Sequence, residues 1–457
     1  MKETRTEYDS MGPVEVPAHT LYGAQTQRAV DNFSISDQKM RAEFIRSLLL
    51  IKLVAADTNQ QLGLLNPEQG SIIVKCCNQL LTDFHMDQFP VPVYQTGSGT
   101  STNMNVNEVV ATLCRQKNID IHPNDHVNLG QSSNDVIPSA LLISTVTGII
   151  KDLLPAIDHL MVSIAGNAER FRHIVKTGRT HLMDALPVKI SAEFLTWNLQ
   201  LDECRERFSS LLPRLSRLPL GGTAVGSGVN CHPDFATKAI RFLSHITDIS
   251  FEASPLAYKG LSSLDTPLEA SGHLKTLATV LLKISNDLRW MNSGPLAGLG
   301  EITLPPLQPG SSIMPAKVNP VIPEAVCMAA AQVTGFDCAN TVAAQSSTFQ
   351  LNTMLPLIAD NLLHALSLLT GSCYALADKV FNDLHVNIAR CSESLSKNPI
   401  LVTALVPEIG YEQAAIIGKT AVLENRPILD VALEKTDITK EKLICLLDPM
   451  KLADGNQ

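Results

Sequence analysis

The chain has 457 residues, which is longer than the roughly 250–300 at which a single hydrophobic core stops growing. We therefore expect two or three domains, or one elongated domain. Apolar residues make up 45% of the chain and charged residues 18%, a composition that excludes a disordered protein. The net charge is −9 and no stretch gathers Lys and Arg, so we expect no nucleic-acid partner.

The N-terminal segment is polar and lacks the apolar stretch of a signal peptide, so we expect a protein that is not secreted. No uninterrupted apolar run reaches the ~20 residues that span a bilayer, and we expect no membrane association. The ten cysteines show neither a CxxC pair nor a zinc-type spacing with histidine. We interpret them as buried free thiols, Cys327 among them, in a reducing compartment, and expect a cytoplasmic protein.

The first part of the chain, residues 1–133, mixes Pro-bearing stretches with helical pieces such as 44–62. This pattern predicts an N-terminal domain of mixed but mostly helical structure.

The middle of the chain, residues 134–390, repeats apolar residues at three- and four-residue steps. The predicted helices cover 146–168 with a bend at Pro155, 194–215, 274–291, about 323–333 and onward, and 354–369. The third opens at Thr266-Pro267-Leu268-Glu269, which combines an N-cap Thr, a first-turn Pro and a capping-box Glu. No strand alternation is evident, so we predict an all-α fold with a central bundle of five long helices.

Apolar positions are spread too widely around these helices for five of them to cover one another, so we expect other subunits to cover the remainder. The last part of the chain, residues 391–457, carries shorter helical stretches with a break at Gly410. It predicts a small C-terminal helical domain.

The densest polar cluster is 309–320, which combines Gly310, two serines, Lys317 and Asn319 with three prolines. Backbone N–H groups around Gly310 can form an anion-binding nest, and Lys317 adds a positive charge beside it. Such surroundings favour a deprotonated Ser311 or a bound carboxylate. Taken alone, the stretch could equally be a surface turn between two helices.

Four other clusters consist of small hydrogen-bonding side chains. They are 96–105 with Ser98 and Thr100, 122–128 with His122, Asn124 and Asp125, 131–135 with Ser132, Ser133 and Asn134, and 177–181 with Thr180 and His181. Small hydroxyl and amide groups supply many directed donors without filling a cavity. The set therefore suits a small dicarboxylate.

Each cluster also has a plainer interpretation. The 131–135 cluster can cap the long helix that follows, which is compatible with substrate binding. The two histidines of 122–128 are spaced like a metal pair, but Pro123 argues against a regular helix and no third ligand is evident, so we expect no metal. By themselves, His181 could be a structural histidine and Glu324 a first-turn carboxylate favoured by the helix dipole.

Together the clusters resemble the fumarase/aspartase superfamily over nearly the whole chain. The matching stretches include 8–12, 21–28 and 220–226 besides the clusters above, and they end at the Gly310–Asn319 signature. The resemblance implies a mostly helical three-domain subunit and a homotetramer with a core of twenty helices. It also implies active sites that three subunits share, a small dicarboxylate substrate, and no metal or organic cofactor.

Two branches of the superfamily compete: class II fumarases, which add water to fumarate in the tricarboxylic acid cycle, and aspartases, which remove ammonia from aspartate. The stretches 96–100, 122–126 and 132–135 look like the fumarase versions, so we favour fumarase. The stretch 315–317 followed by 321–324 looks more like aspartase. A non-catalytic helical scaffold, such as the crystallins related to argininosuccinate lyase, is the third hypothesis.

The resemblance also implies roles for the residues. Ser311, on a mobile loop, would be the base that removes a proton from the carbon next to a carboxylate, and Lys317 and Asn319 would hold the resulting aci-carboxylate. His181, made more basic by Glu324, would serve the leaving hydroxyl. The groups expected to hold the other substrate oxygens are Ser98, Thr100, Ser132, Ser133, Asn134 and Thr180, and those of a second dicarboxylate site are His122, Asn124 and Asp125.

Overall fold

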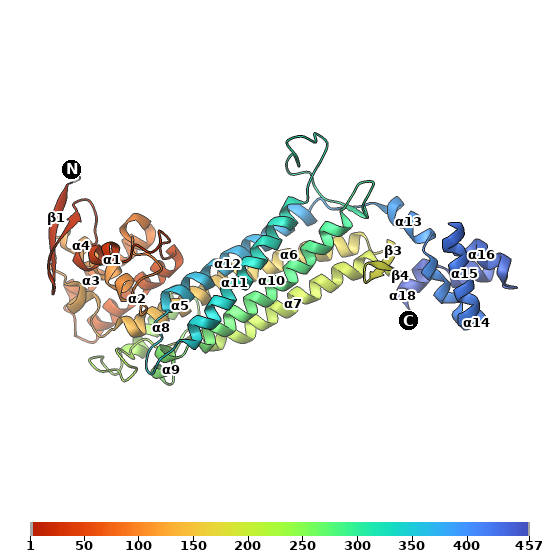
Figure 1. Cartoon of the computed structure of the whole chain (residues 1–457). Coiled ribbons are helices and arrows are strands. Elements are labelled where there is room, and N and C mark those ends of the chain that lie inside the picture. The colour runs from red at the N-terminus through yellow and green to blue at the C-terminus, as the bar shows by residue number, and fades with distance from the viewer. Residues whose placement is uncertain (1–2, 456–457) are drawn as a thin grey trace. The chain divides into compact units, whose positions relative to one another are not determined.

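The structure, a computed structural model, describes residues 3–455 (Figure 1). Met1 and Lys2, part of the polar N-terminal segment considered above, lie outside these residues. The chain divides into two compact units. The first takes in the chain up to Pro155 together with Arg205–Ala278 and Ala331–Thr370, and the second Ala156–Cys204, Thr279–Ala330 and the chain from Gly371 onward. The three-domain division 1–133, 134–390 and 391–457 stays a prediction.

The first unit begins with a small antiparallel hairpin and a group of helices. Strand β1 (Thr4–Asp9) pairs with β2 (Gly12–Pro17), and the helices are α1 (Ala24–Asn32), α2 (Ala42–Gln61), α3 (Pro67–Thr82) and α4 (Thr100–Arg115), with short turns η1 (Met86–Gln88) and η2 (Pro123–Val127). The helix predicted over 44–62 is therefore confirmed as α2.

Polar side chains, one of them distant in the sequence, fix the starts of two of these helices. The buried Glu108 of α4 accepts hydrogen bonds from the backbone N–H groups of Gly23 at 2.9 Å and Gln25 at 2.8 Å, at the N-terminus of α1. Asn66 and Gln69 form a capping box at the start of α3, with Pro67 in its first turn. Such caps satisfy amides that have no partner within the helix.

The middle of the chain folds into long helices. They are α5 (Ser133–Gly148), the π-helical turn η3 (Ile149–Leu153), α6 (Leu154–Arg170), α7 (Ile190–Leu215), α10 (Asp265–Met291), α11 (Val321–Gln345) and α12 (Leu355–Leu376), which ends in the π-helical turn η4 (Ala377–Phe381). The irregular turn η3 stands two residues before Pro155, whose nitrogen has no hydrogen to donate to the preceding turn.

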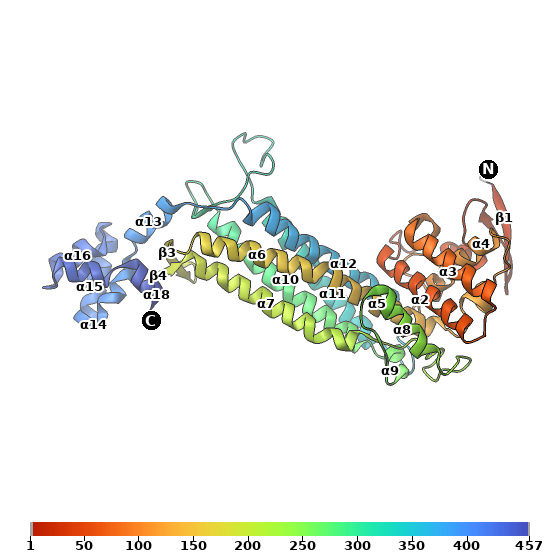
Figure 2. The same ribbon diagram turned by 180° about the vertical axis from the view of Figure 1, so that it is seen from behind.

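Within each unit, segments of these helices lie side by side, as both views show (Figures 1 and 2). The first unit contains α5 and parts of α7, α10, α11 and α12, and adds α8 (Phe235–Thr247), α9 (Ala257–Ser262) and the two-residue strands β5 (Arg217–Leu218) and β6 (Glu252–Ala253). In the second unit Phe194 packs on Trp197 and on Phe381, with ring centroids 5.2 and 6.1 Å away. The predicted all-α fold with five long helices is confirmed.

The second unit also holds the C-terminal helices. They are α13 (Ile388–Ser396), η5 (Pro399–Leu405), α14 (Val406–Ile409), α15 (Tyr411–Glu424), α16 (Ile428–Lys435), α17 (Lys440–Leu446) and α18 (Pro449–Asp454), while β7 (Ile302–Thr303) pairs with β8 (His385–Val386). Their small core includes the buried Leu405, Ile417, Val431 and Leu443.

Three expectations from the sequence need correction. The middle of the chain does contain strands, because β3 (Val175–Thr180) and β4 (Met183–Lys189) form an antiparallel hairpin with too little alternation to be visible in the sequence. Helix α10 begins at Asp265, so Thr266 lies inside its first turn. Six of the ten cysteines are buried, but Cys327 is only half-buried, and Cys338 and Cys445 are exposed.

One helical run, Ser133–Arg170, is long and apolar enough to meet the length and composition of a membrane span. Its most apolar stretch is 61% buried inside the protein, as in a core helix of a helical bundle.

Candidate active site

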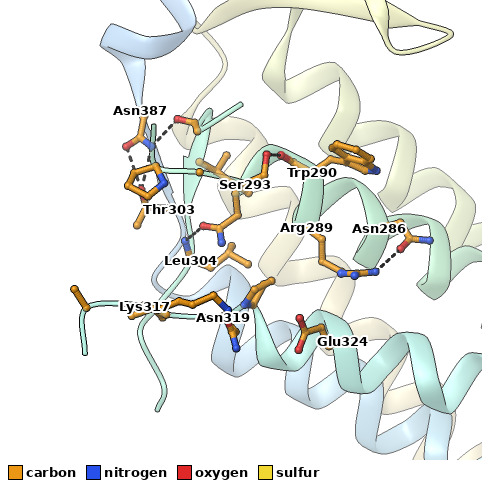
Figure 3. A pocket seen from close by; sticks show the side chains of 18 of the residues that line it. Asn286, Arg289, Trp290, Ser293, Thr303, Leu304, Lys317, Asn319, Glu324 and Asn387 are labelled. Atoms are coloured by element: carbon orange, nitrogen blue, oxygen red, sulfur yellow. Dashed lines mark hydrogen bonds between the residues drawn. The ribbon is translucent and has the colours of Figure 1, made fainter. Parts of the chain in front are cut away.

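The signature loop borders a cavity of about 940 Å³ in the second unit (Figure 3). The side chains of Lys317, Asn319 and Glu324 line it from the loop and from the first turn of α11. Asn286 and Arg289, at the end of α10, line it from the facing helix. Three of the residues predicted from the sequence therefore meet at one cavity.

Hydrogen bonds within the loop join its two ends. The backbone N–H of Gly310 donates to the Lys317 carbonyl at 2.8 Å, and the Asn319 side-chain amide donates to the Gly310 carbonyl at 2.8 Å. The Lys317 ammonium donates to the Asn319 side-chain oxygen at 2.6 Å. A Cβ atom at Gly310 would lie 2.5 Å from the Lys317 carbonyl, so only glycine fits there.

Ser311 does not line the cavity, and its hydroxyl is held within the loop. The Ser311 Oγ accepts from the backbone N–H of Ile313 at 3.2 Å and of Met314 at 3.1 Å. Two N–H donors on one oxygen favour its negatively charged form. Because the Ser311 hydroxyl occupies these two N–H groups, the anion-binding nest expected around Gly310 stays a prediction.

Thr180 and His181 lie at the exposed end of the β3–β4 hairpin and do not line the cavity. Thr180 pairs with Met183, which leaves His181 and Leu182 as a two-residue turn with φ of 56° and 60°. This is the pattern of a type I′ turn, which normally uses Asn or Gly. A left-handed backbone at such residues is strained and is typical of functional sites.

Buried charges anchor the base of this hairpin. Lys176, which is 1% exposed, pairs with Glu301 at 2.8 Å and with Glu193 at 3.0 Å, and Arg179 pairs with Glu301 at 2.5 Å. Burial would raise the pKa of Glu301, but its hydrogen bonds and charge interactions with Arg179 and Lys176 outweigh burial and lower it. The strand that leads to His181 is therefore fixed by an ionised cluster.

The first unit holds the remaining predicted substrate groups at the N-termini of two helices. The hydroxyls of Ser98 and Thr100 lie 2.9 Å apart where α4 begins. Gly99 between them has φ of 74°, and a Cβ atom there would lie 2.9 Å from the Ile137 side chain. Gly97 packs against the backbone of Thr353. Because Gly97 and Gly99 have no side chains, the backbone on both sides of Ser98 packs closely against its neighbours. This packing fixes the position of Ser98.

The second group stands at the start of α5. Ser132 caps the helix by accepting from the Asn134 N–H at 3.2 Å, while Asp135 accepts from the Ser132 N–H at 2.9 Å. Ser133 accepts from the Asn103 side chain at 3.0 Å, and the Asn134 amide donates to the Ala224 carbonyl at 2.8 Å. The capping role expected for this cluster is confirmed.

Asp135 ties this helix start to the glycine-rich stretch 220–228. Its second oxygen accepts from the N–H groups of Gly221 and Thr223, both at 2.9 Å. Burial raises the pKa of Asp135 to about 6, although these hydrogen bonds oppose the rise.

The predicted second dicarboxylate site lies on the exposed turn η2. His122 contacts the Asp125 carboxylate at 3.1 Å and accepts from the Asp125 N–H at 3.2 Å, and Asn124 is exposed beside them. The nearest upstream arginine, Arg115, is engaged with Thr112 at 2.8 Å. Within residues 3–455 no group of three or more His, Cys, Asp or Glu side chains is arranged to hold a metal ion.

Comparison with known proteins places this geometry in a family. A family model described as lyase matches residues 12–335, and one described as fumarase C C-terminus matches 401–454. A protein of Pseudomonas aeruginosa named fumarate hydratase class II 2 is 55% identical over 100% of both chains, and one of Xylella fastidiosa named fumarate hydratase class II is 53% identical over 99% of this chain and 96% of its own. A crystal structure of class II fumarase from Schistosoma mansoni covers 100% of both chains at 36% identity with a TM-score of 0.96.

The chain belongs to the class II fumarate hydratase family. The superfamily and the branch predicted from its polar clusters are therefore confirmed. The roles of individual residues and the number of subunits at each site stay predictions.

Sequence reasoning missed two residues that the structure brings close to these groups. Arg289 lines the cavity opposite Glu324, with its guanidinium donating to Asn286 at 3.0 Å. In the sequence, only the polar residues around Arg289 at the end of an otherwise apolar helix could have indicated a site there. Lys52 is fully buried and donates to Asn128 and Gln131, which precede Ser132 in the chain. It stands in an apolar helical run where only its charge distinguishes it from its neighbours.

Proposed function

We propose that the protein catalyses the reversible anti addition of water to fumarate, giving L-malate, as a carbon–oxygen lyase. The end-to-end match to relatives named class II fumarate hydratase is the observation that carries this proposal. The small hydroxyl, amide and basic side chains of the site support a compact dicarboxylate substrate.

The difficult step in the malate-to-fumarate direction is removal of a proton from the carbon next to a carboxylate, because the charge that develops there is large. In our proposal Ser311 is the base, and the two N–H donors on its Oγ lower the cost of its anionic form. Lys317 and Asn319, whose polar groups line the cavity, hold the carboxylate that gains charge and stabilise the aci-carboxylate intermediate.

The leaving hydroxyl needs a proton from the opposite face of the substrate. We assign this step to His181, with Glu324 raising its basicity, directly or through one water molecule. The other substrate oxygens are held by the remaining predicted groups: Ser98, Thr100, Ser132, Ser133, Asn134 and Thr180. No metal or organic cofactor enters any of these steps.

We further propose a homotetramer whose active sites are each shared by three subunits. Two observations support it. Within one chain, His181 is exposed on its hairpin turn and does not line the cavity that contains Lys317. Large apolar side chains are also exposed on the long helices, including Leu199 at 60%, Met328 at 69% and Val342 at 62%, as expected of surfaces that other subunits cover.

Two further parts of the proposal concern the second site and the compartment. His122, Asn124 and Asp125 form a second dicarboxylate site on the exposed turn η2, supported by their position on one short turn. In our proposal the protein works in the cytoplasm, as part of the tricarboxylic acid cycle. Its cysteines, which are all free, support a reducing compartment.

One assay tests the reaction. Purified protein is incubated with L-malate and, separately, with L-aspartate, and fumarate is followed by its ultraviolet absorbance. We expect fumarate from malate alone. Fumarate from aspartate alone would instead support an aspartate ammonia-lyase, which the Pro315-Ala316-Lys317 stretch favours. Fumarate from neither would support a non-catalytic scaffold.

A further inference from the structure

Helix α2 carries a lysine where a core residue is expected. Lys52 is 0% exposed, and its neighbours Ile51, Leu53 and Val54 are also buried. Lysines are almost never fully buried, because removing an ammonium from water is costly unless the protein compensates. The surroundings of Lys52 therefore call for a physical explanation.

Both hydrogen-bond acceptors of this ammonium are neutral amide oxygens. Lys52 Nζ donates to Asn128 Oδ1 and to Gln131 Oε1, each at 2.9 Å. The buried Asp135 carboxylate acts on Lys52 through its charge, but its two oxygens accept from backbone N–H groups instead. Lys52 thus binds the turn that contains Asn128 and Gln131, whereas the Asp135 carboxylate binds backbone N–H groups of other residues.

That turn is organised around the atoms that Lys52 holds. Asn128 Oδ1 also accepts from the side chains of Asn103 at 3.2 Å and Asn107 at 3.3 Å, and Asn128 Nδ2 donates to the Gln131 carbonyl at 3.2 Å. The Gln131 amide donates to the carbonyls of residues 127 and 129 at 3.1 and 3.3 Å. Lys52 therefore holds both side chains that shape the segment 127–131.

This segment runs directly into the proposed substrate groups. Ser132, Ser133 and Asn134 are the next three residues, and Asn103 donates both to Asn128 Oδ1 and to the Ser133 hydroxyl. A displacement of the turn would therefore move the groups that hold the substrate. Binding and catalytic groups must stay within about 0.5 Å of their productive positions.

The burial of Lys52 costs stability that a simple core residue would not. Desolvation lowers the pKa of Lys52 to about 7, the direction expected when the charged form is penalised. Replacing such a group by an apolar residue of similar length is often neutral or stabilising. Locally unfavourable residues of this kind are typical of functional sites.

We propose that Lys52 is a positioning residue for the dicarboxylate site: its side chain holds the Asn128–Gln131 turn and thereby sets the positions of Ser132, Ser133 and Asn134. This inference rests on the proposed function. It predicts that Lys52 acts on substrate binding, because the groups it places hold the ground-state carboxylate and the proposed proton-transfer groups lie elsewhere in the chain.

The test uses two variants and one control. Lys52→Met keeps the length of the side chain and removes its donors, while Gln131→Met keeps Lys52 and removes one of its acceptors. Ser47→Ala is the control, because Ser47 is also buried on α2 but donates to the Glu43 carbonyl of its own helix, at 3.0 Å. The readouts are kcat and KM for fumarate, the inhibition constant of succinate, and the thermal midpoint of each full-length protein.

We expect KM and the succinate inhibition constant to rise together, at least about 10-fold in Lys52→Met and less in Gln131→Met, with kcat within about 3-fold of the unmodified enzyme. The control should match the unmodified enzyme. If Lys52→Met fails to fold, Gln131→Met carries the test. An unchanged KM in the folded variants, or a fall in kcat alone, would overturn the positioning role. An unmodified protein inactive on fumarate and malate would refute the proposed function instead.

Discussion

Ser311 and Lys317 lie in the same loop, but Ser311 accepts hydrogen bonds from backbone N–H groups whereas Lys317 donates one to a side chain. The Ser311 hydroxyl receives two backbone N–H groups, which favour its anionic form. The Lys317 ammonium is exposed and donates to Asn319 at 2.6 Å, which holds its positive charge at the edge of the cavity. The loop therefore combines a hydroxyl that accepts two N–H groups with a cation at the edge of the cavity.

Removing the Ser311 hydroxyl tests its role as the base. We expect Ser311→Ala to lose roughly 10²–10⁴-fold in kcat while it keeps its fold and assembly, as for other proton-transfer groups. Ser312→Ala, at the exposed neighbouring residue, is the matched control and should stay close to normal. Near-normal turnover in Ser311→Ala would assign the proton transfer to another group.

Lys52 gives a second prediction, on stability against pH. Burial lowers the pKa of Lys52 from 10.5, the ordinary value expected in the unfolded chain, to about 7 in the folded protein. Between these two pH values the unfolded chain therefore holds a proton that the folded protein has released. The stability contributed by Lys52 is therefore lowest below pH 7 and rises as the pH increases toward 10.5.

In Lys52→Met this contribution disappears. The difference in unfolding free energy between the unmodified protein and the variant should therefore increase with pH, by up to roughly 1 kcal/mol per pH unit between pH 7 and 10. Urea midpoints measured across this range provide the check. A constant difference between the two proteins would mean that Lys52 does not titrate there.

The β3–β4 hairpin is the element in which local preference and function conflict most clearly. Its turn places His181 and Leu182 at positive φ, where residues with a Cβ atom are strained. The buried pairs of Lys176 and Arg179 with Glu301 hold the strand in spite of this strain. Helix α5 shows the opposite case, since the polar residues at its start both cap it and are the proposed substrate ligands.

A substitution in the β3–β4 turn tests whether its backbone is strained. Leu182 is 67% exposed, so Leu182→Asn loses little burial and introduces a residue that tolerates the left-handed region. We expect the hairpin to be stabilised by about 1 kcal/mol. Amide hydrogen exchange in β3 and β4 should slow accordingly, whereas the β-branched Leu182→Val should accelerate it. Equal exchange in both variants would show that the turn carries no strain.

Across the molecule as a whole, the proposed catalytic groups are distributed between two compact units. Ser311, Lys317 and His181 belong to the second unit, whereas Thr100 and Asn134 belong to the first. Within one chain the cavity beside Lys317 contains neither Ser311 nor His181 in its lining. The exposed apolar side chains on the long helices support our proposal that neighbouring subunits complete each site.

Subunit exchange tests this arrangement. Ser311→Ala and His181→Asn should each be nearly inactive, but a mixture that is dissociated and reassembled should recover up to about a quarter of normal activity, because some sites then combine intact groups from different chains. Activity before and after exchange is measured, with exchange verified by differently tagged chains. If verified mixed oligomers stay inactive, the two residues come from one chain.

Local patterns were sufficient for the long helices, for the helix-capping role of 131–135 and for the family, because a helix repeat and a short motif depend on residues close together in the sequence. The same patterns named Lys317, Asn319 and Glu324, which the fold brings to one cavity. The β3–β4 hairpin stayed hidden because its strands show little alternation of apolar and polar residues and its turn contains none of the usual turn residues.

Other features could not be predicted from local patterns, because they depend on contacts between distant parts of the chain. The lysine on α2 looks like any charged residue in an apolar helix until the fold buries it against a turn 76 residues away. Arg289 gains its place at the cavity only when the end of α10 faces the start of α11. Periodicity indicates which face of a helix is buried, but which polar atoms meet there is set by packing in three dimensions.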